Sequence, residues 1–452
     1  MFSSTNAPKR RSLIDLFAGC GGVSLGFEQA NFLPVFVNEL NDDARATYLL
    51  NRPHKIGGQP FNKLPQLHSS DVWQLDSARL ERLEADLKSL EHNIRFGESG
   101  TIDVLAGGPP CQGYSGIGHR RSYSVNKVEL PSNHLYDKMA QVIETVRPRI
   151  FLFENVRGLL SSRWTSDGEK GEIWEDILGR YKKLGKKAGY HVRWELVRAR
   201  DYGVPQNRPR VLMVGIRKDV AEASAGLLDV GKNTESAYES GFLPRYGKYP
   251  TPHLSELFED LVDPDIEQIL KSGDYPKYFA TTNYPQRART DLQQYFRPEK
   301  LARKSAPLTE HEYSKHAPRI VEKFRAMIET GKIPSQHQTK KFAQKVLPMN
   351  WGNQGPTITA TSLPDDYVHF VQPRSLSVRE WARLQTFPDW YEFAGKRTTG
   401  GLRRAGNPRE GNFDREVPKY TQIGNAVPVR LAHAVALHFE TILDEAGFQP
   451  QL

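Results

Sequence analysis

Three short segments of this 452-residue chain carry side chains that can do chemistry. Cys111 stands in the sequence GGPPCQGYS at 107–115, Glu154 begins the sequence ENV, and Arg208 and Arg210 stand in QNRPR at 206–210. A thiolate is a nucleophile, and a carboxyl group beside a guanidinium can stabilise charge that develops on a bound substrate. An isolated cysteine is more often a small buried apolar side chain. The prolines and glycines around Cys111 nevertheless favour a fixed, accessible thiol.

A glycine-rich turn, DLFAGCGG at 15–22, follows the apolar segment at 13–17. Glycines let the backbone turn sharply and let a ligand approach closely. Such a turn suits a nicotinamide, a flavin, S-adenosylmethionine or simple chain geometry. Two acidic residues add to it: Glu39 could accept hydrogen bonds from ribose hydroxyls, and Asp71 from an adenine amino group. Taken alone, each acid is better explained as a helix cap or a solvated turn residue.

The elements that must position these residues alternate between strand and helix. Apolar residues at i, i+4, i+7, i+8 and i+11 predict a helix at 135–147, which Pro148 ends. Strands are expected at 13–17, 34–39, 101–106, 150–153, 191–198 and 211–216, and further helices at 173–184 and 431–446. This alternation predicts an α/β fold with a parallel sheet, whose ligands bind beyond the carboxyl ends of the strands. From about 219 to 345 the alternation fades, which indicates a second, smaller domain.

Composition narrows the classes of protein. The net charge of +9 and the isoelectric point near 9.3 are compatible with nucleic acid as a partner, although charge alone gives only even odds. Two cysteines exclude a disulfide framework and a four-cysteine zinc site, and the thirteen histidines do not fall at metal-ligand spacing, so no metal is expected. There is no apolar run of membrane-spanning length and no secretory signal pattern, so we expect a cytoplasmic protein without membrane contact.

The order of these segments resembles the DNA (cytosine-5) methyltransferase family of bacterial restriction–modification type. The matching series is DLFAGCGG, Glu39, Asp71, GGPPCQGYS, ENVRG, QNRPR, RSLSVREWARLQTFPD at 374–389 and IGNAVP at 423–428. The series runs from about residue 13 to the C-terminal helix. The resemblance implies a Rossmann-like methyltransferase sheet that uses S-adenosylmethionine as co-substrate, and a second, smaller target-recognition domain.

For the chemistry, the resemblance implies that Cys111 attacks carbon 6 of a cytosine and so makes carbon 5 nucleophilic. Glu154 would hydrogen-bond the N3 edge of the ring, and Arg210 would hold its O2 carbonyl. Arg208 matches the other arginine of the same motif and is expected to play a supporting part. Because the target atoms lie inside a stacked duplex, the base must be flipped out.

The resemblance also assigns binding residues. Around the cofactor it places Phe17, Gly19, Gly21, Gly22, Glu39, Asp71, Val72, Pro110, Asn425 and Ala426. The family often has serine where Ala426 stands, so the backbone alone would act there. For DNA contact it places the loop at 112–133, with Gln112, Ser115, Arg120 and Arg121. The alternative for that loop is an ordinary polar loop.

The expected domains follow from the motif order. A catalytic and cofactor-binding domain covers 1–218 and is completed by 418–452. A target-recognition domain covers 219–373, and the motif and basic loop at 374–417 connect it back to the catalytic domain. The expected partners are double-stranded DNA and a cognate restriction endonuclease, and the enzyme is expected to act as a monomer.

Three other functions were weighed. A transfer RNA cytosine methyltransferase on the same scaffold would carry a Cys-Phe-Thr element in the recognition region, but no cysteine follows Cys111. A catalytically silent DNA-binding protein would not need Cys111, Glu154 and Arg210 together. A nicotinamide-dependent oxidoreductase accounts for the glycine turn alone.

Overall fold

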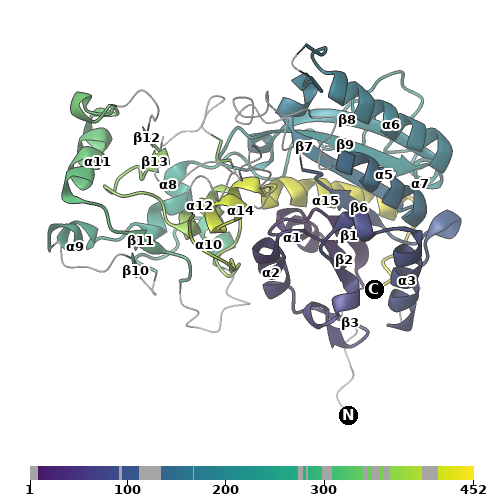
Figure 1. The fold of residues 1–452 in the computed structure, drawn as a ribbon, viewed down its shortest axis with the longest axis horizontal. Helices are drawn as coiled ribbons and strands as arrows, with labels where there is room; N and C mark the ends of the chain where they lie inside the picture. The colour runs from purple at the N-terminus through teal and green to yellow at the C-terminus, as the bar shows by residue number, and fades with distance from the viewer. Residues whose placement is uncertain are drawn as a thin grey trace. The chain divides into compact units, whose positions relative to one another are not determined.

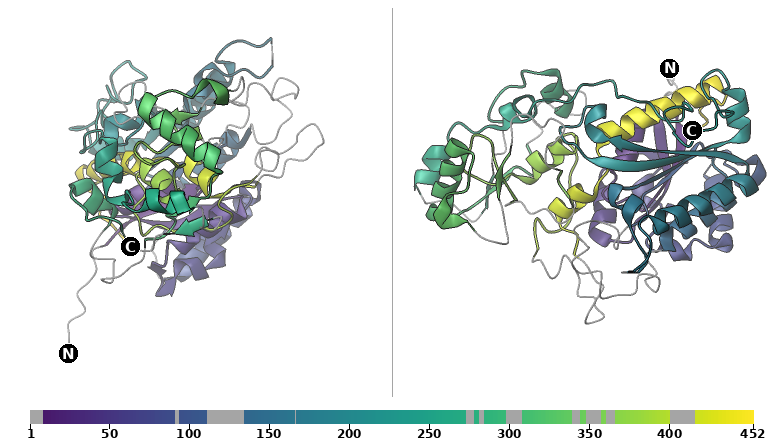
Figure 2. Two further views of the ribbon diagram at one scale, coloured as in Figure 1. Left: turned by 90° about the vertical axis from the view of Figure 1, so that its left-hand side faces the viewer. Right: turned by 90° about the horizontal axis from the view of Figure 1, so that it is seen from above.

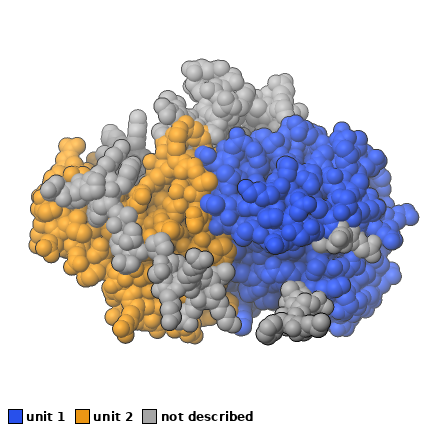
Figure 3. Space-filling view, turned by 90° about the horizontal axis from the view of Figure 1, so that it is seen from below, with its two compact units in different colours: residues 1–202, 209–248, 429–452 blue, residues 203–208, 249–428 orange. Residues whose placement is uncertain are grey.

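The computed structural model describes residues 9–90, 94–110, 134–165, 167–272, 278–280, 284–297, 308–338, 344–347, 357–359, 366–399 and 416–452. The chain divides into two compact units (Figure 3). The first unit comprises residues 1–202, 209–248 and 429–452, and the second comprises 203–208 and 249–428. The limits predicted at 218 and 373, and the recognition role of 219–373, stay predictions.

A seven-stranded sheet forms the centre of the first unit (Figure 1). Its order is β5 (His68–Ser69), β2 (Phe32–Asn38), β1 (Arg11–Leu16), β6 (Val104–Gly107), β7 (Ile150–Val156), β9 (Pro209–Arg217) and β8 (Tyr190–Arg198). Neighbours from β5 to β7 pair in parallel, whereas β9 runs antiparallel to both β7 and β8. The predicted α/β fold is confirmed. The expectation of a parallel sheet is wrong for β9, because the short 199–208 connection between β8 and β9 suits an antiparallel pair.

Helices cover both faces of this sheet. Figure 2 shows α15 (Val429–Glu445) on one side of the sheet, and α5 (Leu135–Val146) and α6 (Glu172–Ala188) on the other. The apolar positions that predict α5 are buried, so this helix forms because one face can be removed from water. In the described part of this unit the other helices are α1 (Gly22–Glu28), α2 (Asp42–Leu50), α3 (Ser77–Ser89) and α7 (Lys218–Ala223), and a hairpin pairs β3 (Lys55–Ile56) with β4 (Gln59–Pro60).

Helix α15 packs very closely on α1. A Cβ atom placed on Gly26 of α1 would lie 2.5 Å from the Cβ of Ala432 in α15, which is too close for any side chain. By length and composition, the stretch Lys419–Glu445 could cross a membrane, but 61% of its apolar window is buried inside the structure. Its packing on α1 explains its apolar character as that of a core helix.

Among its described residues, the second unit has mostly short helices and two small sheets. These helices are α8 (Leu254–Phe258), α9 (Ile266–Ser272), α10 (Asp291–Phe296), α11 (Pro318–Thr330), α12 (Val378–Leu384) and α14 (Lys419–Asn425). Strand β10 (Tyr278–Ala280) pairs with β11 (Glu312–Ser314), and β12 (Lys345–Val346) pairs with β13 (Tyr367–Val368). Elements this short cannot be held by their own hydrogen bonds, so their order depends on what they pack against.

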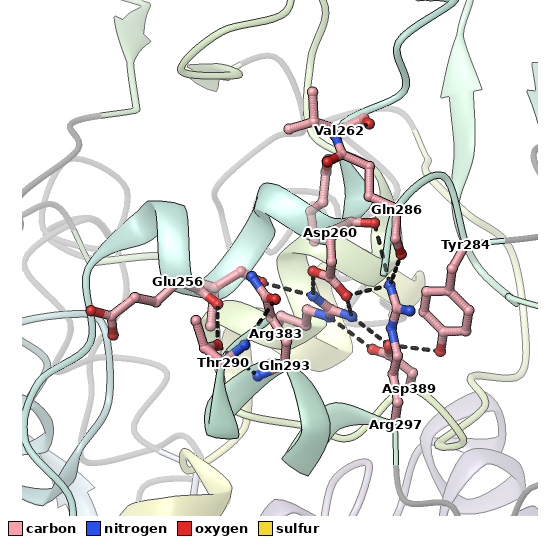
Figure 4. A network of polar contacts seen from close by, with 12 residues as sticks. Glu256, Asp260, Val262, Tyr284, Gln286, Thr290, Gln293, Arg297, Arg383 and Asp389 are labelled. Carbon is pink, nitrogen blue, oxygen red and sulfur yellow. Dashed lines mark hydrogen bonds and ion pairs between the residues drawn. The ribbon is translucent and has the colours of Figure 1, made fainter. Parts of the chain in front are cut away.

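Buried ion pairs organise the second unit around α12 (Figure 4). The guanidinium of Arg383 contacts Asp260 and Asp389, each at 2.6 Å, and the Tyr284 hydroxyl donates to Asp389 at 2.8 Å. Burial works to raise the pKa of Asp389, but the charge and hydrogen bond of Arg383, the charge of Arg379 and the Tyr284 hydrogen bond together outweigh burial and lower the pKa. Removing one member of such a network leaves an uncompensated buried charge. The RSLSVREWARLQTFPD segment is therefore a structural core of this unit.

Candidate active site

The strand order of the sheet reverses at β1, which lies between β2 and β6. The chain continues from β1 to β2 on one side and later places β6 on the other, which makes a topological switch point. In open α/β sheets, ligands bind beyond the carboxyl ends of the strands at such a point. Leu16 pairs with Gly107 at these ends, so the turns after β1 and after β6 begin side by side.

The turn after β1 has an unusual backbone. Phe17, Gly19 and Gly21 have φ angles of +56°, +56° and +88°, so three of five consecutive residues are left-handed. For Phe17 this conformation is costly, since a side chain normally disfavours it. A Cβ on Gly19 would meet no atom of the described residues within 4 Å, so the glycine serves the turn and leaves open space beside it.

Glu39 lies next to this turn, immediately after β2. One carboxylate oxygen, Oε2, accepts the Gly19 N–H at 2.8 Å, and Oε1 accepts the Asn41 N–H at 2.8 Å. Burial raises the pKa of this carboxyl group. A carboxylate oxygen can accept more than one hydrogen bond, so each oxygen retains capacity for a further donor such as a hydroxyl. Glu39 is not a helix cap, because Asn41 caps α2 with its own side chain.

Asp71 follows β5, and it is a helix cap. Its Oδ1 accepts the Trp73 N–H at 3.0 Å and so begins the 3-10 turn Val72–Gln74. The backbone N–H of Glu39 donates to Ser69 at 3.0 Å, which joins the ends of β2 and β5. The two predicted acids therefore stand at neighbouring strand ends. Contact of Asp71 and the buried Val72 with adenine stays a prediction.

Glu154 and Arg210 come together although 56 positions separate them in the sequence. Glu154 lies near the end of β7 and Arg210 near the start of β9, and the antiparallel register pairs Val156 with Arg210. Arg210 Nε lies 2.7 Å from Glu154 Oε1, and the two side chains are 8% and 14% exposed. The sequence prediction placed both at one sheet edge. The reversed direction of β9 is what allows a residue at the start of a strand to reach that edge.

The turn that leads to Cys111 is held against the same strand end. The Asn155 side chain donates to the Pro109 carbonyl at 3.0 Å and accepts the Val156 N–H at 2.9 Å. A Cβ on Gly108 would lie 2.9 Å from Glu154 Oε2, so a side chain there would push the carboxylate out of its position. Sequence reasoning missed Asn155. The feature that could have predicted its role is the Pro109-Pro110 pair. Prolines have no N–H group, so the carbonyls of this turn need a hydrogen-bond donor from another segment.

Arg208 and Gln206 act inside the second unit. Arg208 is buried, and its guanidinium donates to the carbonyls of Ile358, Gly424 at 2.6 Å and Ala426 at 3.1 Å. Gln206 donates to the Leu384 carbonyl at 2.6 Å. Arg208 therefore holds the backbone of the IGNAVP segment, which agrees with a supporting part. Ala426 ends α14, and Asn425 is exposed.

Several predicted residues fall outside the part of the chain that the structure describes. These are Cys111, Gln112, Ser115, Arg120 and Arg121. Pro110 is the last described residue before them and is partly exposed. The roles of all five therefore stay predictions.

S-adenosylmethionine fits the groups at this edge of the sheet. It carries two ribose hydroxyls and an adenine, and the edge offers the Glu39 carboxylate with capacity for hydroxyl donors and the open space at Gly19. This edge accommodates an adenosine-containing cofactor, and the fold is the Rossmann-like α/β sheet of the S-adenosylmethionine-dependent methyltransferases.

Comparison with known proteins gives the family. The model of the family "C-5 cytosine-specific DNA methylase" matches residues 11–440. The chain belongs to this family and is a DNA cytosine-5 methyltransferase.

Relatives of known name agree with this. Type II methyltransferase M.DdeI of Desulfomicrobium norvegicum is 29% identical over 440 residues, which cover 94% of this chain and 87% of the relative. Type II methyltransferase M.BspRI of Lysinibacillus sphaericus is 29% identical over 431 residues, covering 94% and 80%. A crystal structure of a protein described as a DNA modification methyltransferase, encoded within a prophage of E. coli, has a TM-score of 0.61 at 21% identity, covering 96% of this chain and 99% of that one. The structural likeness supports the fold.

Proposed function

We propose that the enzyme methylates carbon 5 of a flipped-out cytosine within a specific duplex sequence, with Cys111 as the covalent nucleophile. The observation that carries this proposal is the Glu154–Arg210 pair, 2.7 Å apart, beside the Gly108–Pro110 turn that leads into Cys111. A carboxyl group and a guanidinium beside the turn that precedes a cysteine suit a planar ring with a polar edge.

Each side chain has a distinct part in this proposal. The Cys111 thiolate adds to carbon 6, and the ring electrons move so that carbon 5 becomes nucleophilic. Glu154 hydrogen-bonds the N3 edge, which gains electron density during attack, and Arg210 holds the O2 carbonyl. Loss of the carbon 5 proton and departure of the cysteine then restore the aromatic ring. Asn155 positions the Pro109 carbonyl and thereby the segment that carries the thiol.

S-adenosylmethionine supplies the electrophilic methyl group. Glu39 would hold its ribose, and Asp71 and Val72 its adenine. Phe17, Gly19, Gly21 and Gly22 would line the turn, and the resemblance also assigns Pro110, Asn425 and Ala426 to cofactor binding. The sequence 112–133, including Gln112, Ser115, Arg120 and Arg121, would contact DNA around the extruded base.

The enzyme would act as the modification partner in a restriction–modification system, as a monomer on duplex DNA, beside an endonuclease of the same sequence specificity. Support comes from relatives that are named Type II methyltransferases and match over most of their length. The region 219–373 would recognise the target sequence. Bisulfite sequencing of DNA from cells that express the chain should show protected cytosines in one sequence context. Protection without any shared context would contradict this proposal.

The nucleophile is tested with a duplex that contains 5-fluorocytosine, since fluorine at carbon 5 prevents completion of the reaction. The wild-type enzyme with S-adenosylmethionine should form an adduct that survives denaturation, and Cys111→Ser should not. Cys20 stays in both proteins and should not replace Cys111, because Cys20 is buried and burial raises its pKa to about 12. An adduct that persists in Cys111→Ser would remove Cys111 from the mechanism. Transfer of label to transfer RNA alone would contradict the DNA substrate.

A further inference from the structure

We propose that Arg52 is a positioning residue for the cofactor: it holds the glycine turn 17–22 in its binding conformation through the Gly21 carbonyl. This inference rests on the proposed cofactor role of that turn. Arg52 lies just after α2, outside the segments that resemble the family motifs. Its side chain is fully buried, which is unusual for an arginine and requires specific partners.

Arg52 contacts the turn directly. Its Nη2 donates to the Gly21 carbonyl at 3.0 Å and lies 3.0 Å from Glu28 Oε2, while Nη1 donates to the Tyr48 carbonyl at 2.9 Å. The same guanidinium stacks on the Tyr48 ring, 3.7 Å from its centroid. One planar group therefore joins the turn, the end of α1 and the end of α2. Lysine has no planar fork and could not make all of these contacts at once.

The position of Gly21 explains why this contact matters for the cofactor. Gly21 caps α1 with a left-handed backbone, and its carbonyl also accepts the Leu25 N–H at 2.9 Å. Two residues earlier, the Gly19 N–H donates to Glu39. Two hydrogen bonds therefore hold the turn: the Gly19 N–H donates to Glu39, and the Gly21 carbonyl accepts from Arg52. A strained turn persists only when its surroundings fix it, so loss of either hydrogen bond should let it relax.

A second layer fixes Arg52 itself. The Ser24 hydroxyl donates to Asp15 Oδ2 at 2.5 Å and lies 2.7 Å from the Tyr48 hydroxyl. Asp15 belongs to β1 and Ser24 to α1, and both are buried, as is Tyr48. The ring on which Arg52 stacks is therefore held by the strand that precedes the turn. Strand, helix and turn are connected through one buried polar network.

Arg52 could instead serve only to compensate the charge of Glu28, and the experiment must separate these roles. Arg52→Lys keeps the charge but loses the fork, whereas Glu28→Gln removes the ion pair and keeps the Gly21 contact. We expect Arg52→Lys to weaken binding of S-adenosylhomocysteine about tenfold by calorimetry, as for one charge-assisted hydrogen bond. Glu28→Gln should change that affinity by less than about twofold. Amide exchange at 19–22 should be faster in Arg52→Lys alone.

Kinetics give a second readout. In Arg52→Lys, the KM for S-adenosylmethionine should rise while kcat at saturating cofactor stays within about twofold, because the reacting groups are untouched. Unchanged affinity in Arg52→Lys, or an equal loss in Glu28→Gln, would overturn the proposal. If Arg52→Lys does not fold, Tyr48→Leu removes the stacking surface together with the hydroxyl contact to Ser24, and the control Tyr48→Phe removes that hydroxyl alone. Tyr48→Leu should then weaken binding of S-adenosylhomocysteine as expected for Arg52→Lys, and affinity equal to that of Tyr48→Phe would overturn the proposal. A wild-type enzyme that fails to bind S-adenosylhomocysteine would instead contradict the proposed function.

Discussion

Glu154 and Arg210 face each other across an antiparallel strand pair, with Oε1 and Nε 2.7 Å apart. Neither side chain is more than 14% exposed, so each partly neutralises the other in a site largely shielded from water. Both groups can still turn polar atoms toward a ring edge, because a carboxylate has two oxygens and a guanidinium has five N–H donors. The pair is therefore a preorganised unit, and its members should not be separable in function.

The first prediction concerns this pair. Glu154→Gln and Arg210→Met should each lower kcat by about 10²- to 10³-fold, as for loss of one group that stabilises developing charge. The double variant should lose little more than the worse single one, because groups that act as a unit are not additive. Single-turnover methylation of duplex DNA measures this. Two losses that multiply would show independent roles.

A second prediction concerns Asn155. Asn155→Ala removes the donor to the Pro109 carbonyl and should lower kcat by about tenfold or more, since displacing a reacting group by a fraction of an ångström is costly. Asn155→Asp keeps the size but cannot donate from an ionised carboxylate, so it should behave like Asn155→Ala. Asn41→Ala, which removes only the cap of α2, is the matched control. Equal kcat in Asn155→Ala and the wild type would contradict a positioning role.

Arg208 should differ from Arg210 in what its loss changes. Arg208→Met leaves the carbonyls of Ile358 and Gly424 without this donor, while the Ala426 carbonyl keeps the Gln385 side chain as a donor. We expect a loss of about 2–5 kcal/mol in the apparent free energy of unfolding, since each buried acceptor left unsatisfied costs about 1–3 kcal/mol. Urea unfolding followed by circular dichroism measures it. A variant as stable as the wild type would show that these carbonyls find other partners.

Asp15 gives a pH prediction. Burial raises its pKa from 3.8 to about 7, against the opposing effects of Ser24 and Arg52 and with the help of Glu39 and Glu28. Below about pH 4 the carboxyl is protonated whether the chain is folded or not. Between that pH and about 7 the folded state holds a proton that the unfolded state releases, so stability is lost as pH rises through 7.

Asp15→Asn should remove this part of the pH dependence. Between pH 5 and pH 8 the Tm of the wild type should fall more than that of Asp15→Asn, in a set of differential scanning fluorimetry runs. The charged, buried form costs on the order of 4 kcal/mol at high pH. Asp42→Asn is the control, because the Asp42 side chain is 89% exposed. Parallel Tm curves for Asp15→Asn and the wild type would contradict the raised pKa.

Much of the fold was predictable because its signals are local. The apolar spacing at 135–147 predicted α5 to within one residue, and the glycines after β1 predicted a turn whose backbone is indeed left-handed. The direction of β9 was not predictable in this way, since strand direction depends on which neighbour a strand finds. Prediction therefore placed Arg210 at the correct edge without the reason for it.

The candidate site divides similarly. Glu39, Glu154 and Arg210 carry signals of residue type at strand ends. Asn155 and Arg52 carry no such signal. Each matters because its side chain donates to a carbonyl that is distant in the sequence, and sequence spacing does not predict such a contact. Arg208 and Arg210 are two positions apart and identical in type, yet one holds backbone within the second unit and the other faces Glu154.

The close packing of Gly26 against Ala432 has a consequence for synthesis. Helix α1, which begins in the glycine turn, leaves the ribosome some four hundred residues before the helix that covers it. Until then the apolar side of α1 does not pack against α15, and the glycine turn that precedes α1 is not stabilised by this packing. The nascent chain would therefore acquire affinity for its methyl donor late, close to the completion of α15.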